Sequence, residues 1–250
     1  MDKKYYIILL IVICLIAWNF NYEFFEIILP PNNEKKVGVI FPYREQVQQN
    51  RSQQLKETLD YYTKLNKPNI DYYIIEQGND KPFNRGILIN AGHDILKKSG
   101  LQYDNEVHHD IDVQANEEFI KYFSSDNVVG KPRYNDSKHF GNISILPLSV
   151  MEQANGYSNN YWGWGGEDNN FRDRIEKKNI SIYRPIPKIN KMNYLPHIKA
   201  TELNLKNTDL ENINRKDKED GYISGLADLK YTIISEEKLS EHVFKITIDF

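Results

Sequence analysis

The stretch Val37-Gly38-Val39-Ile40-Phe41, followed by Pro42-Tyr43-Arg44, decides how this chain folds. The run VGVIF is β-branched and nearly free of polar groups, which is typical of a strand buried on both faces of a parallel sheet. Pro42 then signals a turn, and Arg44 places a cation at the carboxyl end of the strand. Ligands of open α/β sheets collect at that edge. The stretch therefore predicts a central strand that ends at a binding edge.

The segments that follow alternate between helical and extended patterns. Residues 45–66 carry apolar side chains at helical spacing, and Ile70 to Glu76 (IDYYIIE) is a second apolar run. Phe83-Asn84-Arg85 opens another helical pattern, which Gly100 closes. This strand–helix–strand–helix order predicts an α/β fold with a central, mostly parallel sheet and right-handed crossovers.

The second half of the chain is less regular. Its patterns predict helices at 115–123, 147–155 and 167–178 and strands at 127–130, 143–146, 180–183, 229–234 and 243–250. Residues 201–220 are polar and charged and are expected to lie on the surface. The run before Asp110 is more polar than a buried strand is expected to be.

Composition limits the function classes. A chain of 250 residues with 40% apolar content can bury one sizeable core, so one domain is expected. The net charge of −3 provides no basic field, which excludes nucleic acid as the expected partner. Cys14 is the single cysteine, so neither an intramolecular disulfide nor a cysteine-based zinc site is expected.

The N-terminus holds the most apolar segment, Tyr5 to Trp18, which carries no charge and follows Lys3 and Lys4. A membrane helix needs about 20 residues, and aromatic residues up to Tyr22 extend this run to that length. An uncleaved anchor is favoured over a removed signal peptide, because small residues typical of a cleavage site are missing. The predicted organisation is a cytosolic tail at 1–4, a signal anchor at 5–22, a short stem at 23–36 and a folded domain at 37–250.

The stretch Tyr161-Trp162-Gly163-Trp164-Gly165-Gly166-Glu167-Asp168 concentrates unusual residues. Indoles suit stacking on a sugar ring, and glycines let the backbone bend close to a ligand. Glu167 and Asp168 open a helical pattern, where the helix dipole favours negative charge. Composition alone leaves two interpretations open: a loop that contacts a sugar, or a tight turn whose acids cap a helix.

Asp110-Ile111-Asp112 is the second candidate motif. Alternate residues of an extended segment point the same way, so both carboxylates can converge on one cation, or on a cation and a ribose. Hard carboxylate oxygens suit Mn²⁺ or Mg²⁺, which would bridge to a diphosphate. The chain lacks the glycine-rich phosphate loops, so a bound nucleotide would need such a device. The alternative is a solvated loop, with His108 and His109 in structural roles.

Several motifs occur in one order along the chain. They are FPYR (41–44), FNRG (83–86), DID (110–112), FGN (140–142), NNYWGWGGEDNNF (159–171) and His197. This set resembles the β-1,4-galactosyltransferase family, including its xylosylprotein galactosyltransferase branch, over roughly residues 37–250. The N-terminal anchor also resembles that family's single-pass type II topology, with the catalytic domain in the lumen of a Golgi-like secretory compartment.

The resemblance implies a GT-A-type nucleotide-sugar-binding fold and a site that depends on Mn²⁺ or another divalent cation. It implies inverting transfer of a hexose from a UDP-sugar to a saccharide or glycoconjugate acceptor, and the expected hexose is galactose. Transfer of N-acetylgalactosamine is one alternative. A catalytically weak or inactive carbohydrate-binding protein of the same fold is another, and a peripheral membrane-anchored scaffold is the third.

The resemblance also assigns roles to residues. The donor would contact Pro42, Tyr43, Arg44, Phe83, Asn84, Arg85, Asp110, Ile111, Asp112 and Trp164. The acceptor would contact Gly141, Asn142, Trp164, Gly165, Gly166, Glu167 and Asp168. Asp168 would be the catalytic base, Glu167 would orient the acceptor, and Trp164 would lie on a closing loop. Asp112 and His197 would bind the metal, although Tyr194 and Lys199 stand where the family usually has a further ligand.

Overall fold

The computed structural model describes residues 35–131, 140–185, 192–203, 205–207 and 209–250. The predicted cytosolic tail (1–4), anchor (5–22) and nearly all of the stem (23–36) lie outside these ranges. Within them, none of the helices has the length and apolar character needed to cross a membrane.

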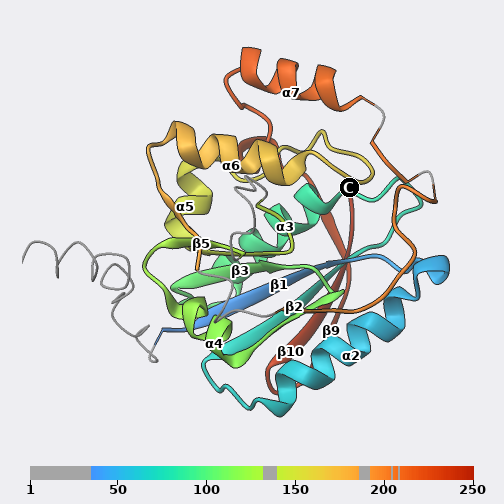
Figure 1. Ribbon diagram of the computed structural model, residues 1–250, viewed down its shortest axis with the longest axis vertical. Helices are drawn as coiled ribbons and strands as arrows, with labels where there is room; N and C mark the ends of the chain where they lie inside the picture. The colour runs from blue at the N-terminus through green and yellow to red at the C-terminus, as the bar shows by residue number, and fades with distance from the viewer. Residues whose placement is uncertain (1–34, 132–139, 186–191, 204, 208) are drawn as a thin grey trace, which may run out of the picture. The chain divides into compact units, whose positions relative to one another are not determined.

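An eight-stranded mixed sheet forms the centre of the domain, in the order β7-β5-β6-β3-β1-β2-β10-β9 (Figure 1). Its strands are β1 (Val37–Tyr43), β2 (Ile70–Gln77), β3 (Asn105–His109), β5 (Val128–Gly130), β6 (Ile143–Pro147), β7 (Ile182–Tyr183), β9 (Thr232–Ser240) and β10 (Val243–Asp249). Strands β3, β1, β2 and β10 run parallel, whereas β6 and β9 are antiparallel to their neighbours. A small second sheet pairs β4 (Val113–Ala115) with β8 (Met192–Tyr194).

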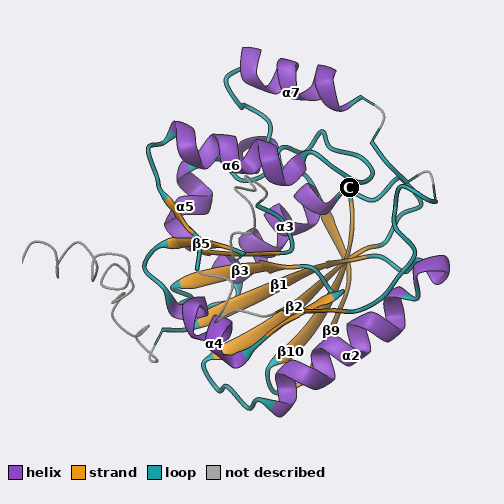
Figure 2. Ribbon diagram, in the orientation of Figure 1, coloured by secondary structure: helices purple, strands orange, loops and turns teal. Residues whose placement is uncertain are grey.

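Helices cover both faces of the sheet (Figure 2). They are α2 (Arg51–Lys64), α3 (Arg85–Lys98), α4 (Glu117–Ile120), α5 (Leu148–Gln153), α6 (Glu167–Lys177) and α7 (Leu210–Glu219). Short 3-10 turns lie at Val47–Gln49, Lys121–Ser124 and Leu226–Asp228. Successive residues of β1 point to opposite faces, so Val39 and Phe41 pack with Tyr62 of α2, whereas Ile40 packs with Leu88 of α3.

Two glycines allow α3 to lie close against the sheet. A Cβ at Gly38 of β1 would fall 2.6 Å from Leu96 Cδ1, and one at Gly92 of α3 would fall 2.7 Å from Ile40 Cγ2. Both distances are far shorter than van der Waals contact. The spacing between α3 and β1 therefore depends on the absence of side chains at these positions.

The predicted α/β fold is confirmed, and the differences have physical causes. The helix predicted for 45–66 begins only at Arg51, because Asn50 adopts the left-handed conformation (φ 54°) and interrupts it. Residues 115–123 divide among β4, α4 and a 3-10 turn. The strand predicted at 229–234 is β9, which extends to Ser240 despite its polar sequence because an edge strand needs backbone pairing and not burial.

The unexpected polarity of β3 is explained by buried partners. Glu106 lies between two histidines, 2.6 Å from His93 Nδ1 and 2.7 Å from His108 Nε2. His109 Nε2 lies 2.6 Å from the hydroxyl of Tyr62. Each of these polar groups is thus satisfied inside the core, which is the condition for burying it.

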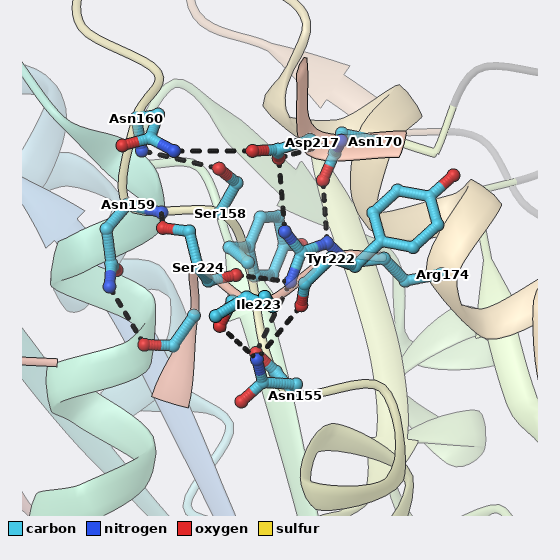
Figure 3. Close-up of polar contacts among 12 residues, drawn as sticks. Asn155, Ser158, Asn159, Asn160, Asn170, Arg174, Asp217, Tyr222, Ile223 and Ser224 are labelled. Atoms are coloured by element: carbon cyan, nitrogen blue, oxygen red, sulfur yellow. Dashed lines mark hydrogen bonds and ion pairs between the residues drawn. The ribbon is translucent and has the colours of Figure 1, made fainter. Parts of the chain in front are cut away.

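A second buried polar cluster joins α6 and α7 to the turn that precedes the Trp/Gly stretch (Figure 3). Arg174 Nη2 lies 3.1 Å from Asp217 Oδ2, and these side chains are 1% and 4% exposed. Arg174 also donates to the carbonyls of Gly156 and Ser224 at 3.2 and 2.7 Å. Asn170 donates to the same Asp217 oxygen at 3.2 Å. A buried ion pair therefore helps to attach helix α7, which the sequence predicted only as a polar surface segment.

Replacing Asp217 by alanine is expected to lower the free energy of unfolding by about 3–5 kcal/mol, because the charge of Arg174 stays buried without its partner. Urea unfolding of the variant and the wild type measures this loss. Glu219→Ala is the matched control on the same helix, since its side chain is 61% exposed and such a pair contributes about 0–1 kcal/mol. Equal losses in the two variants would contradict the expectation.

Candidate active site

The predicted donor residues gather at the carboxyl ends of the parallel strands. Tyr43 ends β1, Asp110 follows β3, and Arg85 opens α3 after β2. Asn84 caps α3, since its side chain accepts from the Ile87 N–H at 3.0 Å. This cap places Arg85 in the first turn of α3 and directs it to the strand ends.

Arg85 joins two motifs that are far apart in sequence. Its Nε lies 2.8 Å from Asp110 Oδ1, and its Nη1 lies 2.6 Å from Asp168 Oδ1 and 4.0 Å from Glu167 Oε1. The residue is 8% exposed. Burial would raise the pKa of Asp110, but the Arg85 guanidinium holds it below its usual range. One buried cation thus connects the donor-side acid of the DID motif with the acid pair of the WGWGGED motif.

Glu167 and Asp168 occupy different environments. Burial, reinforced by repulsion from Asp168, raises the pKa of Glu167 to about 8, with Arg85 opposing the shift. In the described part of the chain, Glu167 Oε2 and Arg85 Nη2 are buried atoms for which no hydrogen-bond partner is found. Buried polar atoms are normally paired, so two such atoms on residues of the same charged cluster indicate where a ligand would bind.

The predicted metal ligands Asp112 and His197 lie together. Asp112 Oδ2 is 3.5 Å from His197 Nε2, and the Leu195 N–H donates to the Asp112 carbonyl at 2.8 Å. Carboxylate oxygens suit Mn²⁺, and imidazole is a common ligand of divalent transition metals. Among the described residues no group of three or more His, Cys, Asp or Glu could hold a metal, and Tyr194 is exposed. The residues present fit a cation that takes its other ligands from substrate and water.

The start of α2 and the 3-10 turn before it were missed by sequence reasoning. Arg51 Nη1 lies 2.8 Å from Asp112 Oδ2. Gln49 and Gln54 are buried and donate to the carbonyls of Ile198 and Pro196 at 2.7 and 3.2 Å, on either side of His197. Glutamines on the inner side of a helix were the available signal.

The FGN motif lies beside Asp110. The Asp110 N–H donates to the carbonyl of Asn142 at 2.8 Å, and Asn142 Nδ2 lies 3.3 Å from Asp110 Oδ2. Asn142 has a positive φ of 72° and Gly141 is buried. Lys131, another residue that the sequence did not indicate, donates to Asn142 Oδ1 at 3.2 Å.

The Trp/Gly stretch runs between two backbone segments. The Gly163 N–H donates to the carbonyl of Phe83 at 2.7 Å, and the Trp164 N–H donates to that of Leu205 at 2.7 Å. Gly163 and Gly166 have φ angles of 82° and 95°, which favour glycine. The Trp164 side chain is left 55% exposed. The backbone is thus held on both sides while the indole is presented to solvent.

The other predicted residues have these positions. Pro42, Tyr43 and Ile111 are buried, and the Tyr43 hydroxyl donates to Glu45 at 2.8 Å. Arg44 donates to the carbonyl of Lys81 and stands over the Phe83 ring, 5.8 Å from its centroid. Gly165 has a φ of 110° in the Trp/Gly stretch. Trp162 packs beside Phe250, with ring centroids 5.9 Å apart.

The fold places the chain among the glycosyltransferases. It is similar to the catalytic domain of a Drosophila β1,4-galactosyltransferase 7 solved with xylobiose, with a TM-score of 0.68 and 25% identity over 86% of this chain and 94% of that one. Residues 30–125 match the family described as the N-terminal region of glycosyl transferase group 7. Residues 124–198 match the N-terminal domain of galactosyltransferase. The chain belongs to the β-1,4-galactosyltransferase family, as its motifs predicted.

Curated relatives agree with this assignment. β-1,4-Galactosyltransferase 4 of Mus musculus is 34% identical over 231 residues, which cover 86% of this chain and 64% of the relative. β-1,4-Galactosyltransferase 1 of Bos taurus is 30% identical over 227 residues, 86% of this chain and 54% of the relative. The chain therefore spans less than two thirds of the length of these relatives.

The raised pKa of Glu167 predicts a pH-dependent loss of stability. The folded protein keeps this proton up to about pH 8, whereas an unfolded glutamate loses it near pH 4.3. The free energy of unfolding contributed by this group therefore falls as pH rises between these values. Glu167→Gln should remove that fall. The difference in unfolding free energy, variant minus wild type, should increase by on the order of 1 kcal/mol or more from about pH 5 to pH 8.

Urea unfolding of the ligand-free proteins at several pH values provides the measurement. Glu176→Gln, whose side chain is 57% exposed on the same helix, is the control and should show a constant difference. A difference for Glu167→Gln that is equally constant would show that the folded protein does not hold this proton.

Proposed function

We propose that this chain is an inverting, divalent-cation-dependent glycosyltransferase. It moves a hexose from a UDP-sugar to a hydroxyl of a saccharide or glycoconjugate acceptor and forms a β-linkage, and the proposed hexose is galactose. The observation that carries the proposal is the contact of Arg85 with both Asp110 and Asp168, in a cluster where Arg85 Nη2 and Glu167 Oε2 are buried and no hydrogen-bond partner is found for them. Support also comes from the relatives' names and from a Drosophila β1,4-galactosyltransferase 7 variant of the same fold, solved with manganese, UDP-Gal and xylobiose.

Asp168 acts as the base in this proposal. Inversion in a single displacement needs a group opposite the leaving group that takes the proton of the acceptor hydroxyl as it attacks the anomeric carbon. Glu167, protonated near neutral pH, donates or accepts a hydrogen bond to orient the acceptor, so the two acids divide the roles by environment. A diphosphate beside Arg85 would give the guanidinium a second anionic partner, so that the ion pair holds Asp168 less tightly and its carboxylate is free to face the acceptor hydroxyl.

The donor side neutralises the charge of the departing UDP. Arg44 and Arg85 provide guanidinium groups, which suit phosphate geometry. Asp112 and His197 would hold the divalent cation, Mn²⁺ first, which supplies electrostatic stabilisation of the leaving diphosphate. Pro42, Tyr43, Phe83, Asn84 and Ile111 complete the walls of this side.

The acceptor side is formed around the exposed indole of Trp164, whose face suits a sugar ring. Gly165, Gly166, Gly141 and Asn142 would form the adjoining backbone of the acceptor side. We place the protein in a membrane through residues 5–22, as a single-pass type II protein with its catalytic domain in the lumen of a Golgi-like compartment.

Asp168→Asn tests the base. Transfer should fall by about 10²–10⁴-fold, the usual contribution of a general base, while UDP binding should be retained. UDP release with UDP-galactose, UDP-N-acetylgalactosamine, UDP-glucose and UDP-N-acetylglucosamine measures transfer, and calorimetry measures binding. Asp173→Asn, one turn further along α6, is the control. An Asp168→Asn variant that keeps most of its activity would refute the assignment. A wild-type protein that binds saccharide but turns over no donor would instead be a carbohydrate-binding protein.

His197→Ala tests the cation site. The Mn²⁺ concentration that gives half-maximal transfer should rise by at least the ~10–100-fold that changes around a metal site cost, and a chelator should abolish transfer by the wild type. His242→Ala, on the β9–β10 turn beside Asp71, is the control. An unchanged Mn²⁺ requirement in His197→Ala would remove this histidine from the site.

A further inference from the structure

Arg51 places a permanent positive charge on the proposed cation ligand. Its Nη1 lies 2.8 Å from Asp112 Oδ2, the same oxygen that lies 3.5 Å from His197 Nε2. The Arg51 and Asp112 side chains are 20% and 13% exposed, so the pair is partly shielded from water. The same Asp112 oxygen thus lies near two groups: the Arg51 guanidinium and the His197 imidazole, which would bind a cation together with Asp112.

This contact is part of a larger arrangement and not an isolated surface pair. Arg51 also donates from Nη1 to Gln54 Oε1 at 3.0 Å and from Nε to Gln49 Oε1 at 3.3 Å. The amide nitrogens of the same two glutamines donate to the carbonyls of Ile198 and Pro196. Gln49 and Gln54 therefore hold both the arginine and the segment that carries His197.

A guanidinium and a divalent cation cannot both occupy Asp112 at low cost. The guanidinium keeps its charge at any pH that proteins tolerate, so the repulsion cannot be relieved by loss of a proton. A cation at Asp112 must therefore displace Arg51. A diphosphate held by that cation would offer the displaced guanidinium a partner that suits its planar, two-pronged geometry.

We propose that Arg51 is the counter-ion of Asp112 in the cation-free protein and moves to the donor diphosphate when cation and nucleotide bind together. The inference rests on the proposed function, in which Asp112 and His197 hold a divalent cation. It makes cation and nucleotide binding strongly interdependent: the cation alone competes with Arg51, whereas the nucleotide gives Arg51 another anion. By linkage, each ligand strengthens the other by the same factor.

Arg51→Gln separates the two roles because it should change two affinities in opposite directions. Without nucleotide, the variant should bind Mn²⁺ about tenfold more tightly than the wild type, since its competitor is gone. With Mn²⁺ present, it should bind UDP about tenfold more weakly, since a phosphate partner is gone. The factor by which UDP tightens Mn²⁺ binding should therefore be about tenfold smaller in the variant than in the wild type. A change of this size lies within the 5–150-fold range typical of coupled sites.

The measurement uses the full chain, with free Mn²⁺ followed by electron paramagnetic resonance and UDP binding by calorimetry. Arg51→Lys keeps the charge and should bind Mn²⁺ alone as weakly as the wild type, which also provides a folded variant if Arg51→Gln is unstable. Arg215→Gln, an exposed arginine on α7, is the control and should change neither affinity.

The outcomes distinguish this inference from the proposed function. If Arg51→Gln binds Mn²⁺ alone no more tightly than the wild type, the counter-ion role is overturned. The cation site is still supported in that case if the wild type binds Mn²⁺ in the presence of UDP. Arg51→Lys that binds Mn²⁺ alone much more tightly than the wild type also overturns it. No Mn²⁺ binding by the wild type even with UDP overturns the cation site itself, and the inference with it.

Discussion

The site depends on the buried guanidinium of Arg85. It is close to Asp110 and Asp168, which belong to segments that meet only in the folded chain. A buried cation is tolerable because these carboxylates surround it, and the carboxylates can approach one another because the cation neutralises them. The end of β3 and the beginning of α6 are therefore fixed with respect to each other by charge as much as by packing.

Behind Arg85 a row of buried polar side chains runs through the core, from Tyr157 to His108 and Glu106. The guanidinium carbon of Arg85 lies over the Tyr157 ring, 5.8 Å from the ring centroid, and the Tyr157 hydroxyl lies 3.1 Å from His108 Nδ1. Burial lowers the pKa of His108, which favours a neutral ring that donates to Glu106 and accepts from Tyr157. In this row Tyr157 donates to His108 and His108 donates to Glu106, so donor and acceptor are fixed in each hydrogen bond. The side chains that pack behind Arg85 therefore have little freedom to rearrange.

Local patterns allowed much of the fold to be predicted, because hydrophobic spacing indicates burial of strands such as β1 and β2. The motifs also identified the acids that Arg85 brings together. Contacts between distant segments were beyond such reasoning: nothing near Arg51 indicates Asp112, and nothing near Asp217 indicates Arg174. The buried polar strand β3 looked anomalous for the same reason, since His93, its partner, lies on α3. The roles assigned to the site residues stay predictions.

The close approach of α3 to β1 has an evolutionary consequence. Gly38 and Gly92 contact no substrate in the proposed site, yet a methyl group at either would collide with the opposing element. Relief would require the Leu96 or Ile40 side chain to shift or α3 to move outward, and Arg85 is the first residue of that helix. Drift at these two interior positions would therefore change where the guanidinium points, and a tolerated substitution should be accompanied by a smaller residue at Leu96 or Ile40. Selection on the chemistry thus extends to residues that never touch it.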